Sequence, residues 1–156
     1  MYALNTLSVR RATLDDDISI AALWRNAWAS ANRWATEIAP IEHWLERVRA
    51  EFRAPKDVVL SLDEQGEING FMVIDLLRGY VDQLFIDPAH QGHGLGGALL
   101  DLACERMPHG WTLHVGRANM GAQRFYAQYG LSRGALSVDP KSGRERLAYR
   151  WNSDSE

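Results

Sequence analysis

One stretch decides the fold: residues 84–100 read LFIDPAHQGHGLGGALL. The apolar run that ends at Ile86 is typical of a buried strand, and Asp87-Pro88 stops it because proline cannot donate to a strand ladder. Four glycines then fall between positions 92 and 97, and an apolar helical pattern follows from Leu95 to Arg106. The stretch therefore predicts a strand, a glycine-rich turn and a helix.

The glycine-rich turn, Gln91–Gly97, predicts a site for an anion. The first N–H groups of a helix have no partner inside the helix, and the helix dipole adds partial positive charge there. Glycines let a large anion approach the backbone, and phosphate is the usual guest. A plain strand-to-helix turn would also use glycine, but four glycines exceed what such a turn needs.

Two other phosphate-binding patterns fit less well. A Walker loop ends in Gly-Lys-Ser/Thr, whereas Gly96-Gly97-Ala98 stands here. Gly92, Gly94 and Gly97 do match the dinucleotide fingerprint G-x-G-x-x-G. However, residues 87–91 separate the strand from the first glycine, and the next strand, which ends at Val115, lacks the acid that would bind a ribose.

Outward from this stretch, helical spacing predicts two helices on its N-terminal side. The first follows a capping box at Thr13 and Asp16, and Pro40 opens the second. Their apolar faces hold Ile20, Trp24, Ala27, Trp28 and Ala31 in the first and Ile41, Trp44, Leu45, Val48 and Phe52 in the second. Strands are predicted over 7–10, 58–62, 68–76, 80–86 and 111–115, a helix over 120–128, and a closing hairpin that ends in 147–151.

The order of elements indicates the fold class. Strands 80–86 and 111–115 with the helix between them form a βαβ unit, so these two strands should be parallel. Short turns make the other strands antiparallel. We expect an α+β fold in a single domain over 1–156, with a mixed, mostly antiparallel central sheet flanked by about four helices.

Composition excludes several classes. The hydrophobic fraction of 46%, the charged fraction of 24% and the net charge of −3 suit a globular protein and leave no basic stripe for nucleic acid. No apolar run is long enough for a membrane span and no signal peptide is visible, so a cytoplasmic location is expected. The only cysteine, Cys104, lies among apolar residues and is expected to be a buried thiol. The five histidines form no pattern of metal ligands.

A second motif adds a family resemblance. Gln91, Gly94 and Gly96 fit the pattern Gln/Arg-x-x-Gly-x-Gly/Ala, and residues 119–131 read NMGAQRFYAQYGL. The latter is similar to N-x-x-A-x-x-F-Y-x-x-x-G-F, with Leu131 in place of the usual Phe. Both motifs, their separation and the order of elements resemble the GNAT N-acetyltransferase superfamily over nearly the whole chain.

The resemblance implies acetyl-CoA as cosubstrate, and the histidine pattern gives no reason to expect a metal. The two parallel strands splay apart in this superfamily, often with a bulge, and the pantetheine arm lies between them. Acetyl then passes directly to an amine without an acyl-enzyme. The cofactor-binding positions carried over are Leu84, Phe85, Ile86, Gln91, Gly92, His93, Gly94, Leu95, Gly96, Gly97, Asn119 and Tyr126.

Three residues receive roles, each beside a structural alternative. Tyr126 matches the acid that protonates the departing CoA thiolate, although its helical spacing also fits a core aromatic. Asn119 matches a cofactor contact and equally fits an N-cap. Asp82 is the candidate base for the amine, or else an amine-binding or structural carboxylate.

Trp28, Trp34 and Glu37 are the candidate acceptor-binding residues together with Asp82, because aromatic rings and a carboxylate can hold a cationic amine. Trp24 and Trp44 fit core packing better. The expected activity is acetyl transfer to a primary amine, of a small molecule rather than a protein N-terminus. A regulatory module that binds acyl-CoA without catalysis is the alternative. The resemblance also implies a possible homodimer.

Overall fold

A seven-stranded sheet forms the middle of the molecule in this computed structural model, which describes residues 7–153. The strand order is β1-β2-β3-β4-β5-β7-β6. The strands are β1 Ser8–Arg11, β2 Asp57–Leu62, β3 Ile68–Asp75, β4 Tyr80–Ile86, β5 Trp111–Gly116, β6 Ser132–Val138 and β7 Glu145–Trp151. All neighbours are antiparallel except β4 and β5. The mixed, mostly antiparallel sheet is therefore confirmed.

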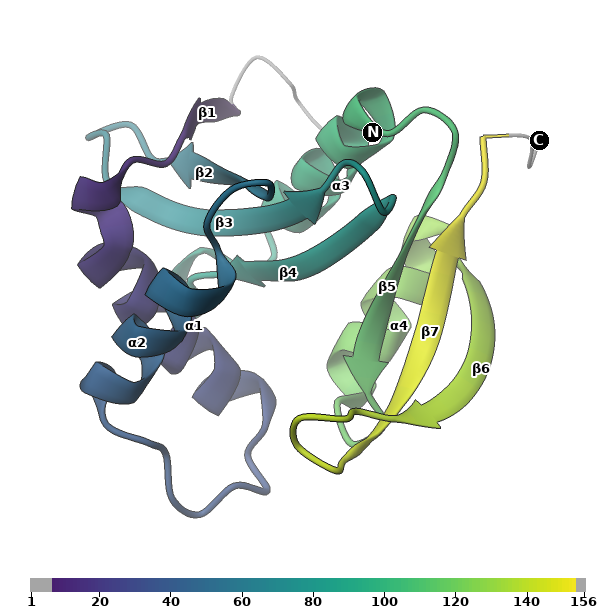
Figure 1. Ribbon diagram of the computed structural model, residues 1–156. Coiled ribbons are helices and arrows are strands. Elements are labelled where there is room, and N and C mark those ends of the chain that lie inside the picture. The colour runs from purple at the N-terminus through teal and green to yellow at the C-terminus, as the bar shows by residue number, and fades with distance from the viewer. Residues whose placement is uncertain (1–6, 154–156) are drawn as a thin grey trace.

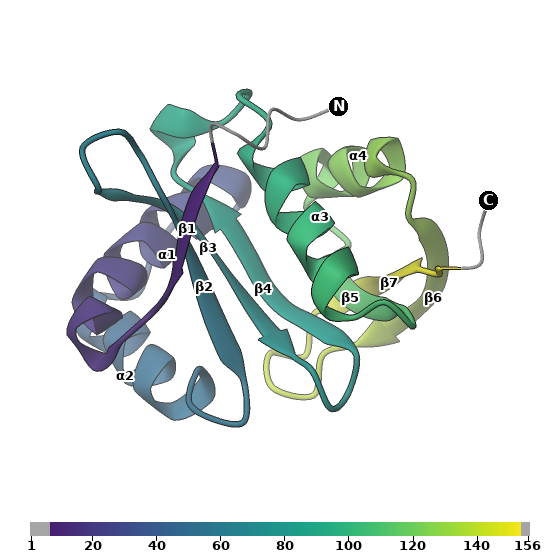
Figure 2. The same ribbon diagram turned by 90° about the horizontal axis from the view of Figure 1, so that it is seen from above.

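Four α-helices cover the sheet, two on each face (Figure 1; Figure 2). They are α1 Asp17–Ala31, α2 Ile41–Glu51, α3 Leu95–Arg106 and α4 Met120–Tyr129, with short 3₁₀ turns η2 Leu14–Asp16 and η3 Pro88–His90. One core packs α1 and α2 on β2, β3 and β4 around Trp24, Trp44 and Phe71. The other packs α3 and α4 around Leu99, Trp111 and Tyr149. Over the described residues, no helix has the length and apolarity needed to cross a membrane.

The predicted elements all occur, with ends that differ by one or two residues. The capping box is confirmed, since the Thr13 backbone N–H donates to Asp16 Oδ2 at 2.8 Å. Pro40 stands just before α2 as its N-cap instead of in its first turn. Trp44, Val48 and Phe52 are buried on the expected face.

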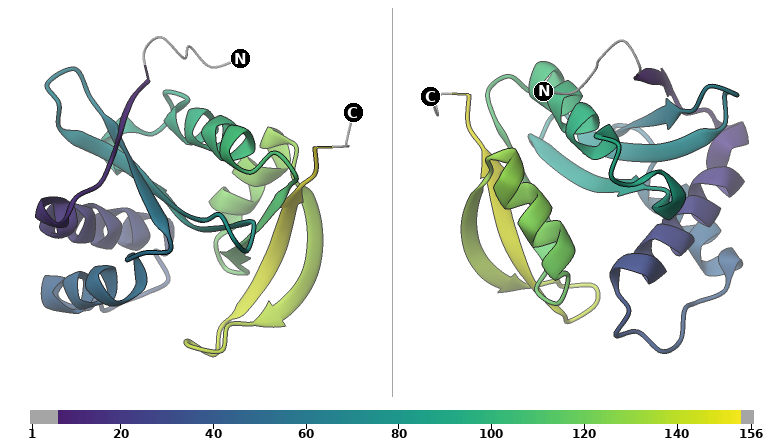
Figure 3. Two further views of the ribbon diagram at one scale, coloured as in Figure 1. Left: turned by 45° about the horizontal axis from the view of Figure 1, so that its top comes forward. Right: turned by 180° about the vertical axis from the view of Figure 1, so that it is seen from behind.

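The sheet splits between β4 and β5. The two strands pair only at Tyr80 and Thr112, where the Thr112 N–H donates to the Gly79 carbonyl at 3.0 Å, and they diverge beyond that point (Figure 1; Figure 3). The register between β3 and β4 shifts at the same place and leaves Asp82 without a partner on β3. Such a bulge bends a strand, so the splay expected from the resemblance is confirmed, together with its bulge.

Candidate active site

A cavity of about 1160 Å³ occupies the split in the sheet. Its walls come from β4 and β5, from α1 and α2, from the start of α4, and from the turn that joins β6 to β7. In Figure 1 this turn extends below the sheet toward the connection between α1 and α2. The cavity therefore brings together segments from the whole length of the chain.

The glycine-rich turn Gln91–Gly97 lies outside this cavity and runs into the first turn of α3. Gly94 is the N-cap of α3 and adopts φ 81°, a left-handed conformation that favours glycine. The Gln91 side chain donates to the Ile86 carbonyl at 3.1 Å and so ties the turn to the end of β4. Since α3 and α4 each follow one of the two parallel strands, both helices begin at the end where the strands have separated.

Gly96 has a packing role that the sequence did not indicate. A Cβ at this position would lie 3.0 Å from Cζ of Phe125 on α4. The missing side chain therefore sets how closely α3 and α4 approach. Anion binding alone does not explain this glycine.

Asn119 and Tyr126 stand at the α4 wall of the cavity. Asn119 Oδ1 accepts the Ala122 N–H at 3.1 Å, so this residue is the N-cap of α4 and also lines the cavity. Tyr126 is 8% exposed and packs against Phe125 and Tyr149. Burial raises the pKa of its hydroxyl well above the usual 10, so the group is protonated throughout the neutral range.

Asp82 faces the cavity from the bulge in β4. Its Oδ2 accepts a hydrogen bond from Lys56 Nζ at 3.0 Å. Lys56 precedes β2 and is half-buried, as Asp82 is. The carboxylate thus already has a charged partner at the cavity wall.

The structure brings together a second titratable pair, Tyr80 and His114, which sequence reasoning missed. The Tyr80 hydroxyl and Nδ1 of His114 lie 2.6 Å apart where β4 and β5 begin to separate, and both residues line the cavity. Burial and then the nearby Arg146 lower the pKa of His114 below 6.5, so the ring is neutral at pH 7 and can accept the Tyr80 proton. The only feature of the sequence that could have indicated this contact was the expected parallel pairing of the two strands that carry Tyr80 and His114.

The expected acceptor-binding tryptophans meet at the α1 wall. Trp28 and Trp34 both line the cavity, with ring centroids 5.9 Å apart at an interplanar angle of 73°. The guanidinium of Arg144, from the β6–β7 turn, lies over Trp34 at 4.8 Å and over Trp28 at 5.5 Å. Glu37 is exposed and does not line the cavity.

Cys104 lies outside the cavity. Its Sγ is 3.6 Å from the Tyr129 hydroxyl, and burial raises the pKa of the thiol. A protonated, half-buried thiol is a poor nucleophile. Within residues 7–153, no cluster of three or more His, Cys, Asp and Glu side chains is placed to hold a metal.

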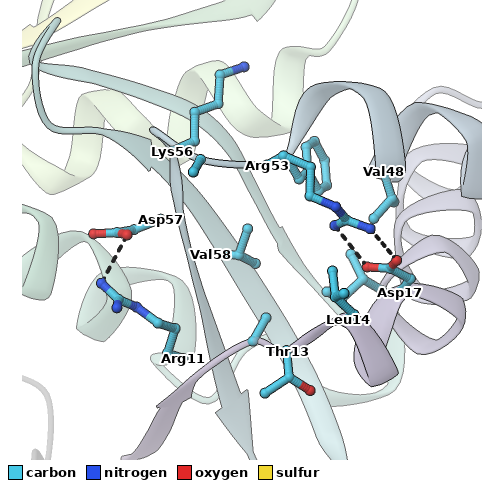
Figure 4. Close-up of a pocket in the computed structure, with 13 residues that line it drawn as sticks. Arg11, Thr13, Leu14, Asp17, Val48, Arg53, Lys56, Asp57 and Val58 are labelled. Carbon is cyan, nitrogen blue, oxygen red and sulfur yellow. Dashed lines mark hydrogen bonds and ion pairs between the residues drawn. The ribbon is translucent and has the colours of Figure 1, made fainter.

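A second hollow, of about 430 Å³, lies between η2, α2 and the start of β2 (Figure 4). Its charged side chains bind one another: Arg53 donates two hydrogen bonds to Asp17, and Arg11 donates to Asp57 at 2.9 Å. Because these groups are paired, the hollow is best explained as part of the packing between the N-terminal segment and α2.

Residues 20–131 match the profile described as "Acetyltransferase (GNAT) family". The chain belongs to this family. A peptidyl-lysine N-acetyltransferase YjaB of Salmonella typhimurium (strain LT2) is 30% identical over 125 residues, which cover 80% of this chain and 82% of that relative.

Solved structures of GNAT proteins share the fold. The apo form of YjaB from Escherichia coli has a TM-score of 0.76 at 24% identity and covers 96% of this chain and 99% of its own. A putative acetyltransferase YncA from Salmonella typhimurium, solved with its cofactor acetyl-CoA, has a TM-score of 0.66 at 21% identity. The match covers 97% of this chain and 96% of YncA. This chain thus shares its overall fold with GNAT proteins of known structure.

Proposed function

We propose that this GNAT protein transfers acetyl from acetyl-CoA directly to the primary amine of a small acceptor. The observation that carries the proposal is the cavity in the split sheet, with the buried, protonated Tyr126 at its wall. The glycine-rich turn would hold the pyrophosphate, and Asn119 with the backbone of residues 84–86 would hold the pantetheine arm. The acetyl-CoA complex of the structurally similar YncA supports this donor.

The reaction needs two proton transfers. The amine nitrogen attacks the thioester carbonyl carbon, a backbone N–H of β4 stabilises the oxyanion, and the C–S bond breaks. Tyr126 gives its proton to the departing CoA thiolate. The attacking nitrogen becomes acidic as it bonds to carbon, so a base must take its proton.

Two groups in the cavity wall are candidates for this base. Asp82 is the first, but its carboxylate is already engaged in an ion pair with Lys56. The Tyr80–His114 pair is the second, and its neutral imidazole can receive a proton through the Tyr80 hydroxyl. We favour this pair as the base and assign Asp82 a role in positioning the amine.

The acceptor class is also part of the proposal. The name of YjaB points to lysine side chains of proteins, whereas a cavity that the β6–β7 turn lines on one side favours a small molecule. Trp28 and Trp34 would contact the acceptor, and Glu37, which does not line the cavity, is left out of this role. We place this single-domain enzyme in the cytoplasm, where acetyl-CoA is supplied.

Release of free CoA from acetyl-CoA, measured with a panel of amines that includes a lysine peptide, tests the proposal. We expect turnover with at least one small primary amine and a faster rate than with the peptide. Tight binding of acetyl-CoA without turnover on any amine would contradict it and would support a regulatory acyl-CoA-binding module.

A further inference from the structure

The cavity has an excess of positive charge. Seven Lys and Arg side chains line it against four carboxylates, an excess of three, whereas the whole chain has a net charge of −3. Lining by one sign of charge raises the local concentration of ligands of the opposite sign. This contrast points to an anionic ligand in the cavity.

Four of the seven cations are paired with carboxylates of the cavity wall. Two of these cations share Glu51. The pairs are Arg47–Glu51 at 2.7 Å, Lys141–Glu51 at 3.6 Å, Lys56–Asp82 at 3.0 Å and Arg117–Glu145 at 2.9 Å. The remaining carboxylate, Asp139, accepts the backbone N–H of Lys141 at 2.9 Å and organises its own turn. The excess charge therefore belongs to the other three cations.

These three are Arg78, in the turn before β4, and Arg144 and Arg146, which are two residues apart where the β6–β7 turn enters β7. Arg144 stacks on Trp34 and Trp28, which leaves the N–H edges of its guanidinium free. Arg146 donates from Nε to Ser137 Oγ at 3.1 Å. In the part of the chain that the structure describes, neither has a carboxylate within 4 Å, and Arg78 has only Asp75 at 3.9 Å.

The phosphates of CoA do not account for these arginines. The glycine-rich turn proposed for the pyrophosphate lies outside the cavity. Arg78 and Arg146 instead lie beside the proposed base, since both act electrostatically on Tyr80 and His114. Arg78 also lies over the Tyr80 ring at 5.0 Å. The three guanidiniums thus belong to the acceptor end of the cavity.

We propose that the acceptor is an amine that also carries a carboxylate, in the simplest case an amino acid, and that Arg144 and Arg146 bind the carboxylate with Arg78 beside them. The proposal rests on the acetyltransferase function proposed above. A planar guanidinium suits a carboxylate because it can donate two parallel hydrogen bonds. An acceptor with a carboxylate also replaces the earlier expectation of a purely cationic acceptor. Arg144 already occupies the Trp28–Trp34 pair, and a polyamine would be repelled by the three arginines.

Binding to the CoA-loaded protein tests the site apart from catalysis. The probes are glycine, L-leucine, L-phenylalanine, L-glutamate and L-lysine, each compared by calorimetry with its α-carboxamide. We expect at least one acid to bind ten-fold or more tightly than its amide. Equal or tighter binding of every amide, or no binding of any acid, would overturn the proposal.

The second part of the test measures the rate of acetyl transfer in the wild type and in matched variants. We expect kcat/KM to be at least ten-fold higher for the preferred acid than for its amide, although the less basic amine of the amide is neutral in a larger fraction of molecules near pH 7. Arg144→Gln and Arg146→Gln should remove most of this preference through KM. Arg133→Gln, an exposed arginine of β6 outside the cavity, should keep it.

The two proposals fail separately. Acids that bind but receive no acetyl would contradict the acetyltransferase function and keep the carboxylate site. Faster acetylation of the amides or of spermidine, or an unchanged preference in both Arg144→Gln and Arg146→Gln, would contradict the carboxylate site and keep the function. Arg146→Lys, which retains the charge without the planar fork, should lie between wild type and Arg146→Gln.

Discussion

Tyr126 belongs to the core and to the cavity at once. Its ring packs in the core of the α3–α4 face, while its hydroxyl has no hydrogen-bond partner among the described residues. A buried phenol with a raised pKa stays protonated in the resting protein, so its proton is available when a thiolate forms beside it. The residue is thus suited to act late in the reaction, when charge appears on sulfur.

Tyr126→Phe removes only this hydroxyl. We expect kcat to fall by on the order of 10²-fold, because that is the usual contribution of a general acid, with little change in acetyl-CoA affinity. Tyr129→Phe is the matched control on the same helix, since that hydroxyl donates to Asp101 at 2.6 Å outside the cavity. Equal rates for Tyr126→Phe and wild type would remove Tyr126 from the role of acid.

The proposed base, the Tyr80–His114 pair, should have a distinct pH signature. Because burial and Arg146 lower the pKa of His114 from its usual 6.5, a rate that needs the neutral ring should rise with pH through a midpoint below 6.5 and then level off. The charged groups that act on the Tyr80–His114 pair are Arg78, Asp82, Asp139 and Arg146.

We therefore expect His114→Gln to lower kcat by at least ten-fold and to remove the acidic limb of its pH profile, with Tyr80→Phe acting in the same direction. His109→Gln, an exposed histidine outside the cavity, should leave the limb in place. Loss of the limb in Asp82→Asn with its retention in His114→Gln would return the role of base to Asp82.

At the scale of elements, the sequence was sufficient for most of the fold. Helical and alternating patterns are local, so the four helices and seven strands were predictable, and the motif around Asn119 placed α4 beside the split. The contacts that define the cavity join distant residues, such as Tyr80 with His114 and Arg144 with Trp34. No local pattern encodes them, because they depend on where β4 separates from β5 and how far the β6–β7 turn reaches.

Gly96 shows how one element limits another. Gly96→Val would push a branched side chain into Phe125, and overpacking of this kind costs about 1–3 kcal/mol. We expect urea unfolding to show that loss for Gly96→Val. In Gly121→Val the nearest atom to the new Cβ is 3.9 Å away, so its stability should stay within about 0.5 kcal/mol of wild type. Equal stability of the two variants would mean that α3 and α4 can move apart at little cost.

At the scale of the whole molecule, the split leaves backbone groups unpaired. The Thr112 N–H points at β4, and N–H groups alternate in direction along a strand, so the His114 N–H should point into the cavity. The Leu113 N–H should point to β7, its antiparallel neighbour.

Hydrogen exchange followed by NMR can read this difference. We expect the His114 amide to exchange at least ten-fold faster than the Leu113 amide in the free protein, and acetyl-CoA to slow the exchange of His114 selectively if pantetheine fills the split. Unchanged exchange at His114 in the presence of saturating acetyl-CoA would place the cofactor elsewhere.

The β6–β7 turn bears on turnover as well as on shape. It is tied to the α1–α2 side by the stacking of Arg144 on Trp28 and Trp34 and by the Lys141–Glu51 ion pair at 3.6 Å. Contacts of these two kinds contribute up to about 1 kcal/mol each where they are exposed, so we expect the turn to be held only weakly. Loops move within nanoseconds to microseconds, whereas enzymes commonly turn over at about 1 to 10³ s⁻¹. We therefore expect the turn to open faster than the enzyme turns over, so that acceptor entry past it would not limit the rate.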